Sequence, residues 1–544
     1  MKRLLAAGTL FALAACSGRG GSTVPATPAT TPGAPSAPSG ATRATLTIAV
    51  PRAGASSAAN RRAPRYVSPS SANLVVAVNG GTASTYGLTP QSPGCVTQAA
   101  QLQCTFQVVA PAGSDTFSLQ LTDGAGNVLS RNVVRATIAS GVATPIGLTL
   151  AAATASVVIV PGAAATVDGT KPPYHVPGLF AQPVEVEALD VDGNVIIGPG
   201  APSVTTVSMS TGGSYAGVAS AQNSDPFAYV LRASGGSAGG QTVAISATVQ
   251  DATLGDGTTP APVSGTTAYT FTPAMVIAAG TLITAVSLES LKTVAQFPVC
   301  ACEGLTIANS IAAASDGTIY AVHASFLGLG ESFAVSVFSP GAESAGRSIT
   351  TGVGGALALA VDKNDDLWVL TGGGFRQPPP SIAEFAPNAS TASFTISGGS
   401  AQLSEPAGIA VDASGDVYES DSAGYVNVYP AGTKTPGTQL SDPSLAQPGP
   451  IALDASGGLY VNDEANQDIA YFAAGSTALT TTLFDSSFYN SGGSMPLVVD
   501  GGGNLWASLS SIPEIEQLAA SSLPSAVTID AYINAVSGPM AIVP

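Results

Sequence analysis

Four side chains in the C-terminal half of the sequence have types and spacing suited to binding a cation or a polar ligand. His323, Asp421 and Asp463 each stand three residues after an aromatic residue, in segments that share one pattern, and Glu464 follows Asp463 directly. Carboxylate oxygens are ligands for hard cations such as Ca²⁺, and a histidine can bind a metal or transfer a proton. If folding brings equivalent positions to one level, the sequence predicts a ligand-binding site at these four residues, with Asp421 and Asp463 as metal ligands.

A structural role for the same aspartates is the competing interpretation. An Asp beside a loop can accept hydrogen bonds from backbone amides instead of binding a ligand. Two further segments carry Thr371 and Leu509 at the equivalent position, and neither can act as an acid. A divalent cation such as calcium is the one cofactor that the pattern suggests, and we assign no catalytic residue.

Motifs typical of common enzymes give no support for catalysis. No G-x-S-x-G elbow precedes a helical segment, and no Gly-rich phosphate loop carries the required Lys. The second histidine of the chain, His175, follows a Pro-Pro-Tyr stretch, which predicts a loop residue. The sequence therefore favours a binding module over an enzyme.

An internal repeat that begins near residue 275 predicts the elements that would position this site. Each unit has a short apolar strand, usually ending in Asp, then a Gly-rich turn and a strand with a large aromatic residue. The Asp can accept hydrogen bonds from the turn, and Gly permits a positive φ. Two more strands complete each unit, and four strands every 40–50 residues are typical of propeller blades. The five complete units start at Ile311, Leu359, Ile409, Ile451 and Leu497.

A sixth start, at residues 540–543, ends the chain without room for its other strands. Residues 281–286 and 292–297 have the strand-like composition to complete it. A composite blade made from both ends of the repeat region would close the ring and remove its exposed edges. We therefore predict a six-bladed β-propeller over residues 275–544.

The units resemble the NHL repeat, most clearly in the segments that start at Ile409 and Ile451. That resemblance implies a propeller fold, and NHL-type propellers include scaffolds, ligand binders and lactonase-like or lyase-like enzymes. In NHL repeats an Asp at the place of the two predicted metal ligands commonly accepts hydrogen bonds from loop amides, so the resemblance implies the structural role for them. Many NHL repeats carry a basic residue after the Asn pair, whereas Tyr425 and Gln467-Asp468 occupy that neighbourhood here. This departure argues against the RNA-binding branch of the family.

The residues between the N-terminus and the repeat predict two β-sandwich domains, at 44–152 and 153–274. Alternating stretches such as Thr116 to Leu121 place apolar side chains on one face of a strand. Both segments resemble bacterial immunoglobulin-like modules. Residues 190–194 resemble the start of a calcium loop, but the later Glu is missing, so a hairpin turn is the better interpretation. The predicted fold class is all-β, with two Ig-like sandwiches followed by the propeller.

The N-terminus is typical of an exported lipoprotein. Residues 1–15 contain a charged start and a short apolar run, and they end in Leu-Ala-Ala before Cys16. This ending resembles a bacterial lipobox, which implies cleavage before Cys16 and acylation of its thiol. Residues 16–43 are rich in Pro, Thr, Ser and Gly, and we expect a flexible linker. The protein would be anchored to the cell envelope, facing the periplasm or the exterior, and the membrane would be the outer one if the cell is Gram-negative.

Export permits disulfides, and four cysteines remain after Cys16. Cys95 and Cys104 lie between two strand-like stretches, which predicts a hairpin disulfide. Cys300 and Cys302 are one residue apart, so two free thiols and a strained local bridge both stay open.

Charge limits the choice of partner. The chain has 34 acidic and 17 basic residues, with a net charge of −17, and such a protein repels nucleic acid. We expect a monomer, anchored to a membrane, that binds a protein, glycan or small molecule through its propeller. A hydrolase or lyase with a divalent metal in the central channel is the alternative, and a passive adhesive spacer is a third hypothesis.

Overall fold

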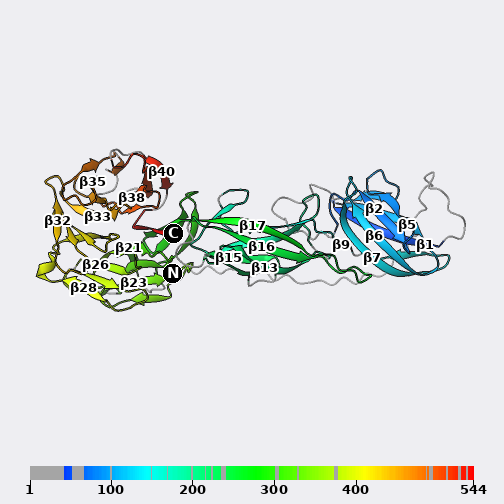
Figure 1. Cartoon of the computed structure of the whole chain (residues 1–544), viewed down its shortest axis with the longest axis horizontal. Coiled ribbons are helices and arrows are strands. Elements are labelled where there is room, and N and C mark those ends of the chain that lie inside the picture. The colour runs from blue at the N-terminus through cyan, green and yellow to red at the C-terminus, as the bar shows by residue number, and fades with distance from the viewer. Residues whose placement is uncertain are drawn as a thin grey trace, which may run out of the picture.

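The computed structural model is built almost entirely of strands arranged in three consecutive bodies (Figure 1). A first sandwich, a second sandwich and a propeller follow one another along the longest axis of the molecule. The structure describes residues 42–543, apart from 52–66, 99–100, 149, 168, 198–199, 215, 222–224, 234–239, 301–304, 328–329, 373–377, 486, 489–493, 510–512, 525–528 and 535–536. The predicted signal peptide, Cys16 and nearly all of the predicted linker therefore lie outside the described residues.

The first body is a sandwich of two sheets whose inner faces form one core. On β6 (Gly113–Thr122), the predicted inward face of Phe117, Leu119 and Leu121 is fully buried, which confirms the alternation. One sheet has the order β4 (Cys95–Gln98), β5 (Gln101–Val109), β1 (Arg43–Pro51), β8 (Ala143–Ile146). The other has the order β3 (Ser84–Gly87), β2 (Asn73–Val78), β6 (Gly113–Thr122), β7 (Val128–Ile138), β9 (Ala151–Ala152).

The predicted disulfide is confirmed. Cys95 of β4 and Cys104 of β5 are paired directly across the two strands and are joined through their sulfurs, with Cα atoms 4.0 Å apart. Cys300 is also disulfide-bonded, so a free thiol at that position is wrong. Cys302 lies outside the described residues.

The second body is a sandwich of two four-stranded sheets. Its predicted hairpin turn is confirmed, because one carboxylate oxygen of Asp190 accepts the amides of Asp192 and Asn194. One sheet has the order β10 (Ser156–Pro161), β12 (Gln182–Leu189), β15 (Ala228–Ala233), β14 (Ala216–Ser220). The other has the order β11 (Tyr174–Pro177), β17 (Val263–Thr272), β16 (Thr242–Gln250), β13 (Ser203–Thr211).

The third body is a propeller of six four-stranded antiparallel blades, as predicted. Blades 1 to 3 are β21 (Leu305–Ala313) to β24 (Arg347–Ile349), β25 (Ala356–Val361) to β28 (Phe394–Ser397) and β29 (Pro406–Val411) to β32 (Thr438–Ser441). Blades 4 and 5 are β33 (Pro448–Leu453) to β36 (Thr481–Leu483) and β37 (Leu497–Val499) to β40 (Ile529–Asn534). Within these five blades, each strand pairs with the next along the chain.

The sixth blade joins the two ends of the propeller. The strands β18 (Ala274–Ala279), β19 (Leu282–Ser287) and β20 (Thr293–Pro298) supply three of its strands, and the C-terminal β41 (Met540–Val543) pairs with β18 as the fourth. The first strand of each blade contacts the first strand of the next, and β41 contacts both β37 and β21. The ring is therefore closed by the last strand of the chain.

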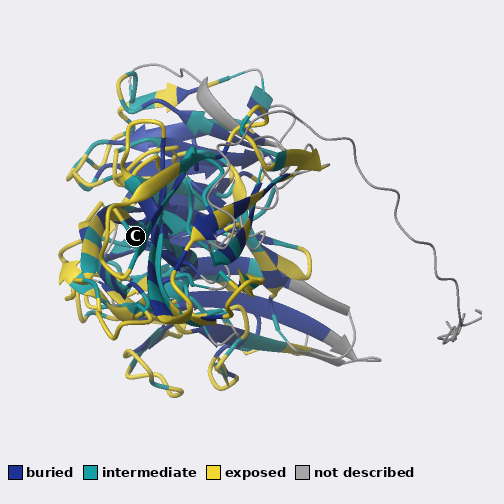
Figure 2. Cartoon of the chain, turned by 90° about the vertical axis from the view of Figure 1, so that its right-hand side faces the viewer, coloured by how far each residue is buried: buried dark blue, intermediate teal, exposed yellow. Residues whose placement is uncertain are grey.

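Each repeat packs its aromatic residue against the following blade; four of the five aromatics are buried and Tyr418 is half-buried. Tyr320 packs with Leu359 of blade 2, and Trp506 packs with Met275 and Ile277 of blade 6. Burial of one such large side chain contributes about 1.5–3 kcal/mol. The strands are mainly buried and the connecting turns exposed (Figure 2). Each blade therefore depends on its neighbour to cover its aromatic residue, and an isolated blade would lack this stabilisation.

The turn chemistry also follows the prediction. In blade 3 one oxygen of Asp412 accepts the amides of Ser414 and Asp416, and Gly415 has a positive φ. In blade 2 the residue with positive φ is Asp365 instead of a glycine.

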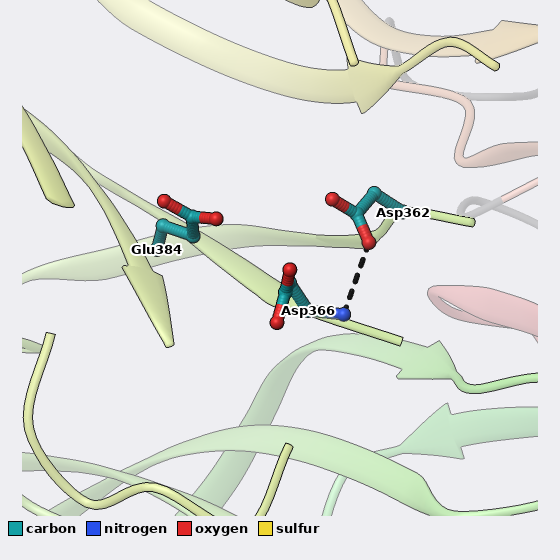
Figure 3. Close-up of side chains that lie close together, drawn as sticks. All are labelled: Asp362, Asp366 and Glu384. Atoms are coloured by element: carbon teal, nitrogen blue, oxygen red, sulfur yellow. Dashed lines mark hydrogen bonds between the residues drawn. The ribbon is translucent and has the colours of Figure 1, made fainter. Parts of the chain in front are cut away.

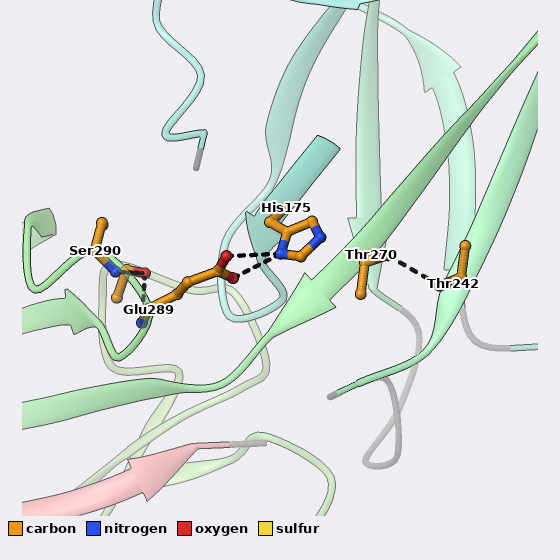
Figure 4. A network of polar contacts seen from close by, with 6 residues as sticks. His175, Thr242, Thr270, Glu289 and Ser290 are labelled. Atoms are coloured by element: carbon orange, nitrogen blue, oxygen red, sulfur yellow. Dashed lines mark hydrogen bonds and ion pairs between the residues drawn. The ribbon is translucent and has the colours of Figure 1, made fainter. Parts of the chain in front are cut away.

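The second sandwich packs onto the propeller through the segment after β11. Phe180 lies edge-on to Phe297 of blade 6, with ring centroids 5.9 Å apart. On β11 itself, Nδ1 of His175 lies within hydrogen-bond distance of Glu289, 2.8 Å from each carboxylate oxygen (Figure 4). The prediction of a loop position for His175 is wrong, because its segment pairs in parallel with β17 as a strand.

Candidate ligand-binding channel

The strand of each blade that contacts its counterparts in both neighbouring blades is called the inner strand here; it is the first strand in blades 1 to 5 and β41 in blade 6. The inner strands of blades 1 to 4 each contain a β-bulge at the equivalent position. Their pairing with the second strands shifts register at Ala308–Ser310, Ala356–Ala358, Pro406–Gly408 and Pro448–Ile451. A bulge redirects a side chain out of the sheet, and such irregularities recur beside functional sites. The residues within the shifts include Asn309, Leu357, Ala407 and Pro450, and all four line one cavity.

This cavity is the central channel of the propeller. Its volume is about 600 Å³, and residues on or directly before all six inner strands contribute to its wall. Most of the wall is apolar or small, with Leu357, Ile409 and Ile451 among its larger side chains. Its polar members among the described residues are Asn309, Ser310, Glu464, Ser494 and Ser537. A cavity of this size and mixed lining is typical of a small-molecule site.

Buried polar side chains from neighbouring blades hold the channel wall in place. Ser420, fully buried on β30 (Val417–Asp421), donates to the carbonyl of Gly449, which lies in the bulge of the next blade. At the same position in blades 4 and 5, Asn462 accepts from the amide of Met495, and Ser508 accepts from the amide of Gly538. Backbone groups within or just before the inner strands thus find side-chain partners one blade away, as buried amides and carbonyls require.

Glu464 is the one predicted site residue that lines the cavity. It follows β34 (Leu459–Asp463), and its own amide donates to the carbonyl of Gln447 at 2.9 Å. One carboxylate oxygen accepts from Nε2 of Gln447 at 3.2 Å. Among the described lining residues it is the only ionisable one.

Asp421 and Asp463 are fully buried and bind loop amides. Asp421 accepts the amides of Ser404 and Glu405, and Asp463 accepts those of Ala446 and Gln447. In each blade these amides belong to the loop that leads into the inner strand. The two aspartates therefore position the start of the channel wall, and their role as metal ligands stays a prediction.

His323 is buried in the interior of blade 1 and does not line the cavity. It lies on β22 (Ile319–Leu327), with Nδ1 3.4 Å from the hydroxyl of Ser336. Burial lowers the pKa of His323, because the charged imidazolium loses its hydration. The neutral ring is therefore favoured around pH 7.

A cluster of three carboxylates in blade 2 joins the turn between its first and second strands, which carries Asp362 and Asp366, to Glu384 on the third strand, β27 (Ser381–Phe385). The oxygens of Asp362, Asp366 and Glu384 approach one another within 4.8 Å (Figure 3). Burial raises the pKa of Asp366 and of Glu384, and the neighbouring carboxylates add to this effect. One oxygen of Asp362 already accepts the amide of Asp366 at 3.0 Å. The proximity of like charges alone therefore does not define a ligand site here.

The sequence contained a signal for the channel that the spacing argument missed. Channel-lining residues precede the first apolar residue of each repeat, whereas the prediction focused on residues after the aromatic position. The buried polar residues Ser420, Asn462 and Ser508 also align with one another in the repeat. Their function becomes visible only when the next blade is placed beside them.

Comparisons with known proteins leave the family open. No known family model and no curated protein matches the sequence. Among solved structures, the nidogen/laminin complex matches with a TM-score of 0.40 and 14% identity, covering 50% of this chain and 98% of that chain. The β-propeller domain of Cps50 (Swd1) from Myceliophteria thermophila gives 0.33 and 12%, covering 47% and 81%. Streptogramin B lyase gives 0.28 and 15%, covering 42% and 68%. These values carry no conclusion about activity.

Proposed function

We propose that this protein is an exported, lipid-anchored binding module that captures its ligand in the central channel of the propeller. The observation that carries the proposal is the 600 Å³ cavity, whose wall is formed by all six inner strands. Inter-blade hydrogen bonds fix that wall before any ligand arrives. Such pre-organisation lowers the entropic cost of binding.

The composition of the wall favours a binding role over a metal-dependent hydrolase or lyase. The described lining offers one carboxylate, from Glu464, whereas Ca²⁺ takes six to eight oxygen ligands. Elemental analysis of the purified protein tests the alternative directly. A stoichiometric divalent cation that is lost in Asp421→Ala or Asp463→Ala would favour the metal-dependent enzyme.

The proposal that the channel binds the ligand is tested by a substitution that fills the cavity. Ala407 lines the cavity at the bulge of blade 3, so Ala407→Trp should occlude it, whereas Ala413→Trp adds the same side chain to an exposed turn. Ligand-observed NMR with a library of small fragments should show binders that the wild type and Ala413→Trp share and Ala407→Trp lacks. Equal fragment binding by all three proteins would contradict the proposal.

The anchor is proposed from the N-terminal sequence. Cys16 and the residues before it have the order of a lipoprotein signal, and several acyl chains would hold the protein firmly on a membrane. Within the described part of the chain, no helix has the length and apolarity to cross a bilayer. Metabolic labelling with a palmitate analogue should mark the wild type and not Cys16→Ser, and a labelled serine variant would refute acylation at this residue.

The two sandwiches would carry the propeller away from the membrane, because they follow the anchor in the chain and lie in line with the propeller (Figure 1). We further propose that the repeats are of the NHL type and the sandwiches Ig-like, on the strength of the repeat sequence and the two-sheet topology.

A further inference from the structure

The described wall of the channel carries one ionisable side chain, a carboxylate. Glu464 is the only ionisable side chain among the described residues of the wall, and the other polar groups there are one amide and three hydroxyls. The basic residues of the propeller sequence are Lys292, Arg347, Lys363, Arg376 and Lys434, and none of those described lines the channel. An anionic ligand would meet a negative field without a counter-charge, whereas a cationic ligand would find a partner.

The position of this carboxylate depends on a glycine in the inner strand of blade 4. A β-carbon at Gly449 would lie 2.6 Å from Oε1 of Glu464, 2.8 Å from its Cγ and 2.9 Å from its Cδ. The carboxylate therefore occupies the space that a side chain at position 449 would fill, directly before Pro450, which lines the cavity. The other carboxylate oxygen, Oε2, accepts a hydrogen bond from Nε2 of Gln447. Any larger residue at position 449 would displace the carboxylate from the wall.

The rest of the wall restricts which cation fits. No aromatic side chain is among the described lining residues, so the cage that recognises quaternary ammonium groups is missing from this part of the chain. A single carboxylate also provides too few ligands for a divalent metal. Asn309 and Ser537 supply neutral oxygens that can accept further N–H bonds, and the apolar wall suits a hydrocarbon stem.

We propose that the channel binds a primary ammonium group on an apolar stem, with the ammonium at Glu464 and the stem along the apolar wall. The inference rests on the proposed function and specifies its ligand class. The same chemistry occurs in a free alkylamine and in a lysine side chain of a partner protein. In both cases the ammonium would be desolvated against Glu464 and share its remaining hydrogens with neutral oxygens.

The test compares three probes of equal length on the full mature protein. Hexylamine, hexanol and hexanoate are titrated at pH 7 by NMR or calorimetry. A charge-assisted hydrogen bond predicts that hexylamine binds about tenfold more tightly than hexanol, with hexanoate the weakest. Glu464→Gln should remove the preference for hexylamine, and Gly449→Ala should reduce it. Glu405→Gln, which neutralises an exposed carboxylate that does not line the cavity, should retain the preference.

The outcomes separate this inference from the proposed function. If hexanol binds as well as hexylamine and both are lost in Ala407→Trp, the channel binds ligands but the ammonium assignment is wrong. If no probe distinguishes the wild type from Ala407→Trp, the channel proposal loses its support as well. A lysine whose α-amino and α-carboxyl groups are blocked distinguishes the two sources of the ammonium group. Binding as strong as that of hexylamine supports a lysine side chain of a partner protein. Failure to bind supports a free alkylamine.

Discussion

Glu419 occupies a position in blade 3 that the other complete blades fill with an apolar side chain. The equivalent residues Ala321, Val369, Val461 and Ala507 are fully buried, and so is Glu419. One carboxyl oxygen accepts from Nδ2 of Asn427 at 2.9 Å, and the other has no hydrogen-bond partner. Burial raises the pKa of Glu419 to about 8 from its ordinary value of 4.5, an effect that the hydrogen bond from Asn427 partly opposes and Asp421 reinforces.

Replacing Glu419 by Gln should therefore change how the stability of the propeller depends on pH. Between pH 4.5 and about 8 the folded protein keeps a proton that the unfolded chain releases, so stability falls as the pH rises. Each pKa unit corresponds to about 1.36 kcal/mol, which gives a loss of about 3 kcal/mol at pH 7 and at most about 5 kcal/mol above pH 8. Glu419→Gln lacks this loss, and its advantage over the wild type should grow with pH across that window.

The measurement is urea unfolding followed by tryptophan fluorescence. The chain has two tryptophans, Trp368 and Trp506, and both are buried in the propeller, so the sandwiches do not contribute to the signal. Asp468→Asn is the matched control, because burial raises the pKa of Asp468 only to about 6. It should flatten the profile below pH 6 and leave the slope between pH 6 and 8 intact. An unchanged slope between pH 6 and 8 in Glu419→Gln would refute the reasoning.

Three further perturbations test the architecture. Deleting residues 539–544 removes β41, and we expect loss of the cooperative unfolding transition seen by tryptophan fluorescence; a wild-type midpoint would contradict closure by the last strand. Ser420→Ala leaves the carbonyl of Gly449 without its partner and should lower the unfolding free energy of the propeller by about 1–3 kcal/mol, whereas the exposed Ser441→Ala should leave it unchanged. Cys95→Ser should destabilise the first sandwich by about 2–3 kcal/mol, measured by near-ultraviolet circular dichroism, and tryptophan unfolding that shifts by the same amount would show that the effect is not local.

The propeller could be predicted from the sequence because the same stabilising interactions recur in every repeat. An apolar strand, an Asp–Gly turn and an aromatic residue recur at one spacing, and each unit needs a neighbour to bury its aromatic. The incomplete start at residue 540 also required strands from the other end of the repeat, and β18, β19 and β20 provide them. Periodicity and the requirement to remove edges predicted the fold and the composite blade, and of its three strands from the start of the repeat region they named two, β19 and β20, and missed β18.

The site could be predicted only in part, because it depends on contacts between blades. Glu464 was selected for its place beside Asp463, yet it reaches the channel because Gly449 leaves room for its carboxylate. The bulges depend on partners such as Ser420 that belong to a different repeat. A pattern within one repeat cannot show which backbone groups the next blade will satisfy. Glu419, in contrast, stands out in the aligned sequence as an acid in an apolar column.

The structural and functional interpretations of Asp463 are connected by the loop before β33. Its carboxylate holds the amides of Ala446 and Gln447, and Gln447 in turn binds the carboxylate of Glu464. The same loop leads into Gly449, whose carbonyl is held by Ser420 and whose missing side chain admits Glu464. Asp463 can therefore control the channel without touching a ligand. A change in binding on replacing Asp463 would by itself not identify a metal ligand, and the elemental analysis is what distinguishes the two roles.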